Sequence, residues 1–143
     1  MQAKQLSVFI ENREGRLEEV LAVIKNAGVN ILSLSLADTS EYGLLRLIVS
    51  DPAKGDAALK EKGFSSMLTD VLVVRLDNKV GSLQAFLSEI SKKDINLEYM
   101  YGLTIEKEGK ASLVIKTSDL AAASEILIKA GAELLTAEDI AAI

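Results

Sequence analysis

The sequence predicts an α+β protein made of two similar βαββαβ units of the ferredoxin-like type, each an antiparallel sheet with helices on one face. Strand-like and helix-like apolar patterns follow one another in the order strand, helix, strand, strand, helix, strand, and this order occurs twice. The stretch 11–31 also occurs again, sixty-six positions later, as 77–97. We therefore predict two domains, 1–70 and 71–143, that follow each other almost without a linker and lie side by side.

The first domain is expected to begin with a strand, because Leu6, Val8 and Ile10 alternate with other residues. After a polar loop, four apolar residues recur at the spacing of one helix face, and Gly28 is expected to end that helix. The four residues are Leu17, Val20, Leu21 and Ile24. Burying such a face is worth roughly 1.5–3 kcal/mol per side chain, so we expect it to lie in the core.

The remainder of the first domain is expected to contain three strands and a second helix. The expected elements are a strand over 29–37, a hairpin turn over 38–43, a strand over 44–49, a helix over 52–62 and a strand over 64–69. Leucines alternate with serines in the first of these strands, whereas the second is apolar on both faces. Asp51 and Pro52 are typical of a helix start, and Gly55 is expected to weaken this helix.

The second domain repeats this order. Its expected elements are a strand over 71–76, a helix with the apolar face Leu83, Phe86, Leu87 and Ile90, a strand over 95–105, a hairpin over 106–110, a strand over 111–116, a helix over 119–130 and a strand from 134. The helix face matches that of the first domain at an offset of 66, and the offset becomes 68 after the hairpin. The second hairpin is therefore expected to be two residues longer. The tail 137–143 shows no clear pattern.

The composition argues against several classes of function. The chain carries 21 acidic and 16 basic side chains, a formal net charge of −5, so neither a nucleic acid nor an anionic membrane is expected as a partner. It has no cysteine and no histidine, which excludes disulfides, the usual zinc sites, and thiol or imidazole catalysis. No apolar run approaches the roughly 20 residues that cross a bilayer, and no signal segment is evident. We expect a soluble, cytoplasmic protein without a metal or cofactor.

Each copy places a glycine directly before its first helix, Gly15 in one and Gly81 in the other. Each glycine follows an asparagine by three residues, Asn12 and Asn78 respectively. The N–H groups of a first helical turn point toward such a loop, with the positive end of the helix dipole behind them, so a carboxylate or phosphate would bind there. The local alternative is that the glycine serves the turn and the asparagine caps it.

A second asparagine opens the second strand of each copy. Asn30 and Asn96 follow the first asparagines by 18 positions in both copies. Because an amide offers both donors and acceptors, this set matches a zwitterion, whose carboxylate needs donors and whose ammonium group needs acceptors. The alternative is that an asparagine at a strand start bonds local backbone. Duplication copies structural and functional residues alike, so the repetition itself does not decide between them.

The segments 11–17 and 28–31 resemble the ACT domain, a small regulatory module that binds amino acids in many metabolic enzymes. The segments 77–83 and 94–97 resemble it a second time, so the resemblance covers essentially the whole chain. It implies a free-standing tandem ACT protein with no catalytic domain attached. It further implies pairing of the domains into a continuous eight-stranded sheet, with ligand sites at the interface between paired domains.

In amino-acid-binding ACT domains, an asparagine of the first loop and one at the start of the second strand hold the ligand's polar groups. By this resemblance the predicted ligand-binding residues are Asn12, Gly15, Arg16, Leu17, Asn30 and Ile31 in the first copy, and Asn78, Gly81, Ser82, Leu83, Asn96 and Leu97 in the second. The loop proline that is common in the family is replaced here by Glu14 and Val80. The histidine that some relatives add to the ligand site is also absent.

The sequence thus predicts a non-catalytic sensor that binds a free amino acid, forms a homodimer and acts on a metabolic-enzyme partner. No activated nucleophile or acid–base pair is evident, and a fold shared with acylphosphatase-like enzymes does not establish activity. The aromatic residues Tyr99 and Tyr101 could stack RNA bases, but the acidic charge favours packing against a paired subunit. The competing hypothesis is an assembly module without a ligand, because the strands 44–49 and 71–76 are apolar on both faces.

Overall fold

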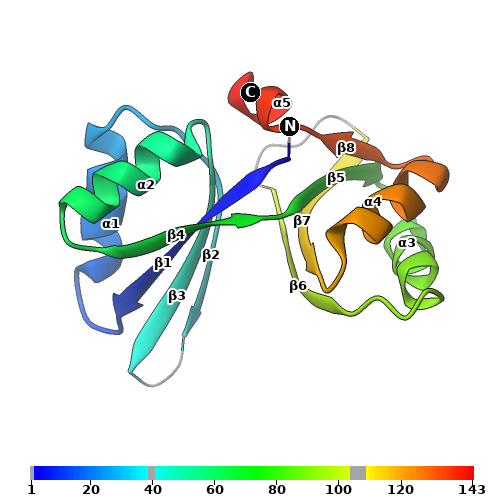
Figure 1. Cartoon of the computed structure of the whole chain (residues 1–143), viewed down its shortest axis with the longest axis horizontal. Coiled ribbons are helices and arrows are strands. Elements are labelled where there is room, and N and C mark those ends of the chain that lie inside the picture. Colours follow the sequence, from blue (N-terminus) through cyan, green and yellow to red (C-terminus); the bar gives the residue numbers. More distant parts are fainter. Residues whose placement is uncertain (1, 39–40, 104–108) are drawn as a thin grey trace. The chain divides into compact units, whose positions relative to one another are not determined.

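The computed structural model describes residues 2–38, 41–103 and 109–143. The strands form two four-stranded sheets, and each carries two helices on one face (Figure 1). The first set of elements is β1 (Lys4–Glu11), α1 (Arg16–Asn26), β2 (Ile31–Asp38), β3 (Tyr42–Val49), α2 (Pro52–Glu61) and β4 (Ser65–Asp70). The second set is β5 (Leu72–Asp77), α3 (Ser82–Ser91), β6 (Leu97–Gly102), β7 (Lys110–Thr117), α4 (Leu120–Lys129), β8 (Glu133–Leu135) and α5 (Ala137–Ala141). None of the helices in these ranges is long and apolar enough to cross a membrane.

Both sheets have the same strand order, β2-β3-β1-β4 in one and β6-β7-β5-β8 in the other. Leu6 of β1 lies opposite Leu47 of β3, and Leu72 of β5 lies opposite Ile115 of β7. These partners differ by the offsets 66 and 68 that the sequence shows, so the two copies share one register. The predicted fold class is confirmed. The described strands pair within these two four-stranded sheets, and the expectation of one continuous eight-stranded sheet stays a prediction.

The chain divides into two compact units, which we call the N-terminal and the C-terminal unit. The N-terminal unit contains Lys4–Thr69 and Ile140–Ile143, and the C-terminal unit contains Met1–Ala3 and Asp70–Asp139. In the C-terminal unit, the Val71 N–H donates to the Ala3 carbonyl at 3.2 Å, and the Gln2 amide donates to the Val71 carbonyl. The sequence-based domain boundary between 70 and 71 stays a prediction.

The core of the N-terminal unit lies between its sheet and its two helices. Val20 and Ile24 of α1 are buried there, and Leu17 packs against the same cluster. These side chains contact the inward-facing residues of β1 and β3, among them Leu6 and Leu47. Three of the four residues of the predicted helix face therefore belong to the core, whereas Leu21 is only partly buried and is not part of this cluster.

The core of the C-terminal unit has the same arrangement, with one exception. Phe86 and Ile90 of α3 are buried, and Leu87 packs against them. Leu83, however, is 40 % exposed. Its side chain lines a surface depression along α3, together with Leu87, instead of reaching the sheet. The prediction that Leu83 belongs to the core face is wrong.

Strand β2 departs from the predicted alternation of buried leucines and exposed serines. Leu34 and Leu36 are 44 % and 46 % exposed, whereas Ser33 is buried. Both leucines lie opposite core residues of β3, Leu34 opposite Leu47 and Leu36 opposite Leu45, so they share the core face of the sheet. Their exposure follows from their position on the edge strand β2, at the margin of this core.

The strand ends differ from the prediction mainly in the C-terminal unit. Strand β6 ends at Gly102 rather than at 105. The predicted hairpin tips fall largely on 39–40 and 104–108, which lie outside the described residues.

The tail contains the short helix α5, which begins with a capping box. The Asp139 N–H donates to Thr136 Oγ1 at 3.1 Å, and the Thr136 N–H donates to Asp139 Oδ2 at 2.8 Å.

The starts of α2 and α4 confirm the predicted aspartate caps. Asp51 Oδ1 accepts a hydrogen bond from the Lys54 N–H at 3.2 Å, and Asp119 Oδ1 accepts one from the Ala122 N–H at 3.0 Å. Gly55 of α2 has a packing role besides its effect on helix propensity. A Cβ atom at this position would lie 3.1 Å from Leu6 Cδ2, so the glycine allows α2 to pack closely on β1.

Asp56 links α2 to β4. Its carboxylate accepts a hydrogen bond from Ser66 Oγ at 2.6 Å and forms an ion pair with Lys60 Nζ at 2.8 Å. Burial acts to raise the pKa of Asp56, but the hydrogen bonds from Lys60 and Ser66 outweigh this effect and hold the pKa below its usual value. The ionised carboxylate therefore stabilises the fold above the ordinary carboxyl pKa. This contribution is lost as the pH falls through the lower pKa of the folded protein.

We expect Asp56→Ala to lower the free energy of unfolding at neutral pH by about 1–2 kcal/mol, because Ser66 and Lys60 both lose a partner. The difference from the wild type should shrink as the pH falls below about 4. Urea unfolding followed by circular dichroism at neutral and acid pH measures both effects. Glu61→Ala, near the exposed end of the same helix, is the control. A loss no larger than that of the control, or one that persists unchanged in acid, would contradict the role of Asp56.

Candidate functional site

The loops that precede α1 and α3 share one backbone conformation. Gly15 and Gly81 are the N-cap residues and have φ angles of +81° and +84°. An added Cβ atom would meet nothing within 4 Å at either glycine, so the left-handed backbone is what favours glycine here. The local alternative is therefore confirmed for the glycines, which serve the turn, whereas capping of the turn by Asn12 and Asn78 stays a prediction.

The first turns of α1 and α3 leave backbone donors directed toward these loops. The first i→i−4 bonds run from the Glu19 N–H to the Gly15 carbonyl and from the Ala85 N–H to the Gly81 carbonyl, each at 3.0 Å. The N–H groups of residues 17–18 and of residues 83–84 precede these bonds and have no acceptor inside the helix. Together with the helix dipole, they favour an anionic group near the loop.

The strand-start asparagines are held by their backbone. The Asn30 N–H donates to Ser50 Oγ at 2.9 Å, and the Asn30 carbonyl accepts from the Ser50 N–H at 2.9 Å. Asn96 makes the same two bonds with Ser118, at 3.0 and 2.9 Å. Each strand-start asparagine therefore makes local hydrogen bonds, as the alternative to ligand binding predicted. The bonds involve the backbone atoms of the asparagines. Both residues are exposed.

Within one unit, the two predicted asparagines lie at opposite ends of the sheet. Glu11, which precedes Asn12, pairs with Tyr42 of β3, whereas Ile31, which follows Asn30, pairs with Val49. Seven residue steps along β3 separate these partners, or about 23 Å. In the second sheet, the partners of Asp77 and Leu97 on β7 are Lys110 and Thr117, again seven steps apart. The structure thus does not bring the loop and strand asparagines of one unit together.

The remaining predicted residues fall into different environments. Leu17, Ile31 and Leu97 are partly buried and pack against the cores, so they have a structural role. Leu83 is exposed and shares with Gly81 the depression along the outer side of α3. These four predicted ligand-binding positions therefore also contribute to core packing or to the shape of the surface.

Arg16 is occupied by contacts inside its own unit. Its guanidinium carbon lies 4.6 Å from the centre of the Phe64 ring, and Nη1 forms an ion pair with Glu19 at 2.6 Å. The equivalent residue of the C-terminal unit is Ser82, which can make neither contact. This difference argues against one shared ligand-binding role for the two positions.

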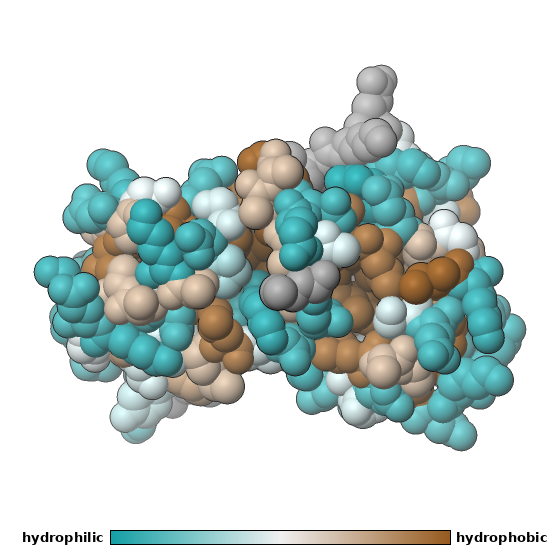
Figure 2. Space-filling model, turned by 45° about the horizontal axis from the view of Figure 1, so that its top comes forward, coloured by the Kyte–Doolittle hydropathy of each residue, from teal (hydrophilic) through white to brown (hydrophobic). Residues whose placement is uncertain are grey.

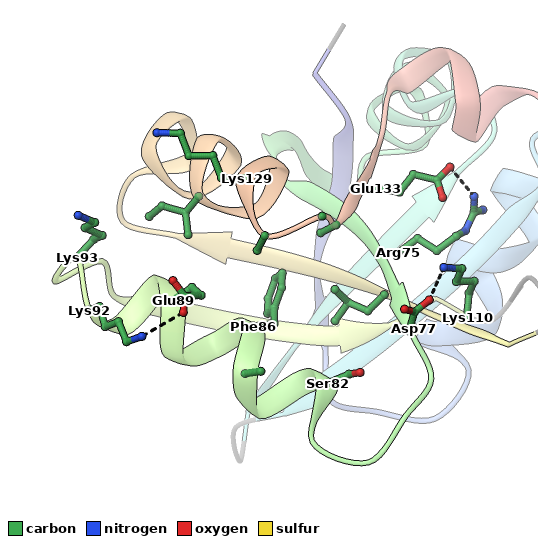
Figure 3. Close-up of a pocket in the computed structure, with 16 residues that line it drawn as sticks. Arg75, Asp77, Ser82, Phe86, Glu89, Lys92, Lys93, Lys110, Lys129 and Glu133 are labelled. Atoms are coloured by element: carbon green, nitrogen blue, oxygen red, sulfur yellow. Dashed lines mark hydrogen bonds and ion pairs between the residues drawn. The ribbon is translucent and has the colours of Figure 1, made fainter.

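The C-terminal unit contains a cavity of about 850 Å³ that the sequence did not predict. It lies between α3, α4 and the adjoining part of β5 (Figure 3). Of the predicted residues, only Ser82 lines it. A comparison of the two copies could have revealed the cavity, because the small residue Ala132 occupies the position of the bulky Phe64 in the first copy.

Two ion pairs lie at one side of this cavity. Arg75 Nη1 contacts Glu133 Oε1 at 3.0 Å, and Lys110 Nζ contacts Asp77 Oδ1 (Figure 3). The hydrogen bond from Lys110 lowers the pKa of Asp77 below its usual value. In the part of the chain that the structure describes, no group of three or more acidic side chains could hold a metal ion.

A family model described as an ACT domain pair matches residues 1–143. Among solved structures, protein BT0572 from Bacteroides thetaiotaomicron is 37 % identical, with a TM-score of 0.92. The similarity covers 100 % of this chain and 98 % of that protein. No curated protein sequence matches the chain.

Two more distant structures share the fold. The regulatory subunit of aspartate kinase from Thermus thermophilus, in a ligand-free form, is 14 % identical with a TM-score of 0.66, over 90 % of this chain and 92 % of that one. The regulatory subunit of aspartate kinase from Thermus flavus is 17 % identical with a TM-score of 0.62, over 92 % and 94 %. At these identities the similarity concerns the fold alone.

We expect Gly81→Ala to lower the free energy of unfolding by about 1–2 kcal/mol, because alanine is disfavoured in the left-handed backbone at this N-cap. Gly102→Ala is the matched control, since a Cβ atom there also meets nothing within 4 Å and its φ is not in the left-handed region. Chemical denaturation of the two variants tests the difference. Equal stabilities would show that the φ angle of Gly81 does not constrain the loop.

Proposed function

The chain belongs to the family of ACT domain pairs, and from this premise we propose that it is a non-catalytic regulatory protein that binds a free amino acid. The observation that carries the proposal is the duplicated set of polar groups. Each copy offers an exposed loop asparagine, first-turn N–H groups that have no acceptor inside the helix, and an exposed strand-start asparagine. Donors suit the carboxylate of an amino acid, and amide oxygens suit its ammonium group.

The separation inside each unit indicates how such a site would be composed. Asn12 and Asn30 of one unit are about 23 Å apart along the sheet, which is too far for one amino acid to bridge. We therefore propose that the loop of one ACT unit and the strand start of another unit supply a shared site. That second unit belongs either to the same chain or to a second copy in a homodimer. The predicted residues Asn12, Asn30, Asn78 and Asn96 are its proposed polar contacts.

The titratable groups support a non-catalytic role. The chain has neither histidine nor cysteine. The side chains that most often act as a general base or a nucleophile, imidazole and thiol, are therefore absent from the sequence. We propose that the protein acts by binding, with a metabolic enzyme as the partner that responds.

The competing function is an assembly module without a ligand, which rests on the strands 44–49 and 71–76 that are apolar on both faces. Exposed apolar side chains such as Phe9 and Met67, each 50 % exposed, also favour it. Figure 2 shows apolar side chains among hydrophilic ones on the face that it displays. Light scattering after gel filtration distinguishes a monomer, which would count against assembly, from a larger species.

We expect one or more of the twenty amino acids, at millimolar concentration, to raise the melting temperature of the protein, because a ligand that binds only the folded state stabilises it. Asn12→Ala and Asn30→Ala should each weaken the binding at least tenfold, since each removes hydrogen bonds to the ligand, and a tenfold change corresponds to about 1.4 kcal/mol. Isothermal titration calorimetry measures the affinities.

The control is Asn26→Ala, which removes an exposed asparagine at the end of α1, outside the predicted set. Its affinity for the amino acid should equal that of the wild type. The proposal fails if no amino acid stabilises the protein. It also fails if the control variant loses as much affinity as Asn12→Ala and Asn30→Ala.

A further inference from the structure

The cavity of the C-terminal unit exists because two bulky groups of the first copy have small replacements in the second. The Phe64 N–H donates to the Leu59 carbonyl at 3.0 Å, and the Ala132 N–H donates to the Leu127 carbonyl at 3.0 Å, so positions 64 and 132 are structurally equivalent. In the N-terminal unit, the Phe64 ring is buried beneath the guanidinium of Arg16. In the C-terminal unit, Ala132 and Ser82 occupy these two places and leave the space open.

The walls of the cavity combine an apolar surface with charged groups. Apolar atoms come from α3, β5, α4 and the segment after α4. They belong to Phe86, Leu76, Ile126, Ala85, Ala130 and Ala132. A volume of about 850 Å³ falls within the range of about 300–1,000 Å³ that is typical of small-molecule sites. The space therefore suits an organic molecule with an apolar body.

The charged groups of the cavity have a basic surplus, although the whole chain is acidic. The lining contains five basic and three acidic side chains. Its acidic members are already paired: Glu133 with Arg75, Asp77 with Lys110, and Glu89 with Lys92. The ammonium groups of Lys93 and Lys129 form none of the ion pairs found among the residues that the structure describes. Figure 3 shows Lys93 at the end of α3 and Lys129 at the end of α4, on the same side of the cavity.

The basic surplus is specific to the second copy. The residues of the first copy at the positions of Lys93 and Lys129 are Ala27 and Glu61. Arg75 Nε is buried without a hydrogen-bond partner among the described residues, but so is Arg16 Nε in the first copy, so this donor does not distinguish the two copies.

We propose that this cavity binds a small organic anion with an apolar body, such as an aromatic or branched carboxylate. The apolar body lies against Phe86 and Ile126, in the space that Phe64 fills in the first copy. The carboxylate lies near the basic side chains Lys93 and Lys129. This site is separate from the loop and strand asparagines, none of which lines the cavity. The proposal of this site therefore does not depend on amino-acid binding at those asparagines.

The test uses 1-naphthylacetate as an anionic probe and 1-naphthylacetamide as its neutral counterpart. Methyl NMR spectra of the full chain should show that the acid shifts the signals of Ile126 and Leu76, which line the cavity. The acid should bind at least tenfold more tightly than the amide, and added salt should reduce this difference, because salt screens charge interactions.

Two kinds of variant locate the site. Ala132→Phe places in the second copy the ring that fills the first, and should abolish binding of the acid. Its control is Ala121→Phe, which adds the same ring at an exposed position of α4 outside the cavity lining and should leave the affinity unchanged. The double variant Lys93→Ala/Lys129→Ala keeps the cavity walls and should reduce the preference for the acid over the amide to less than threefold. This double variant tests the proposal even if Ala132→Phe does not fold.

Three results would overturn the proposal. The first is that neither probe shifts Ile126 or Leu76 at millimolar concentration. The second is that the acid and the amide bind equally well to the wild type. The third is that a folded Ala132→Phe variant, or the double lysine variant, binds the acid as the wild type does.

Discussion

The connection from β1 through α1 to β2 is the constraint on which most of the structure depends. β1 and β2 each pair with β3 in the antiparallel direction, so they run parallel to each other and flank it. The chain must therefore cross the whole length of the sheet between them, and α1 makes this crossing. It follows that the loop before the helix and the strand after it open at opposite ends of the unit. The position of every proposed ligand contact is a consequence of this geometry.

Duplication has kept the backbone of the two copies and changed their side chains. The left-handed glycine before the first helix, the serine bonds to the strand-start asparagine and the aspartate caps occur in both copies with closely similar distances. Side chains that fill space differ far more, as the pair Arg16 and Phe64 against Ser82 and Ala132 shows. Backbone hydrogen bonds constrain the two copies to one fold. The interior between the helices is free to become solid core in one copy and a cavity in the other.

Much of the fold could be predicted from the sequence, because local signals determine it. The caps at Asp51 and Asp119 and the apolar face of α1 are read from residues close together in the chain. The tail could also have been assigned, since Thr136 and Asp139 have the spacing of a capping box. The errors arose where long-range packing decides. Leu83 and Leu34 have the right periodicity for burial but are exposed. Leu34 lies on an edge strand, and Leu83 lines a surface depression, although its equivalent Leu17 packs against the core.

The sequence by itself determined the element order, the duplication and the family, because hydrophobic periodicity, capping residues and the repeated loop segments are local properties. It also identified the four asparagines that we propose as ligand contacts. Only the tertiary structure decided that the two asparagines of one unit are about 23 Å apart, because this distance depends on which strands pair and in which register. It also decided that the second copy contains a cavity. A void results from side chains that meet across distant elements, and no single stretch of the chain specifies it.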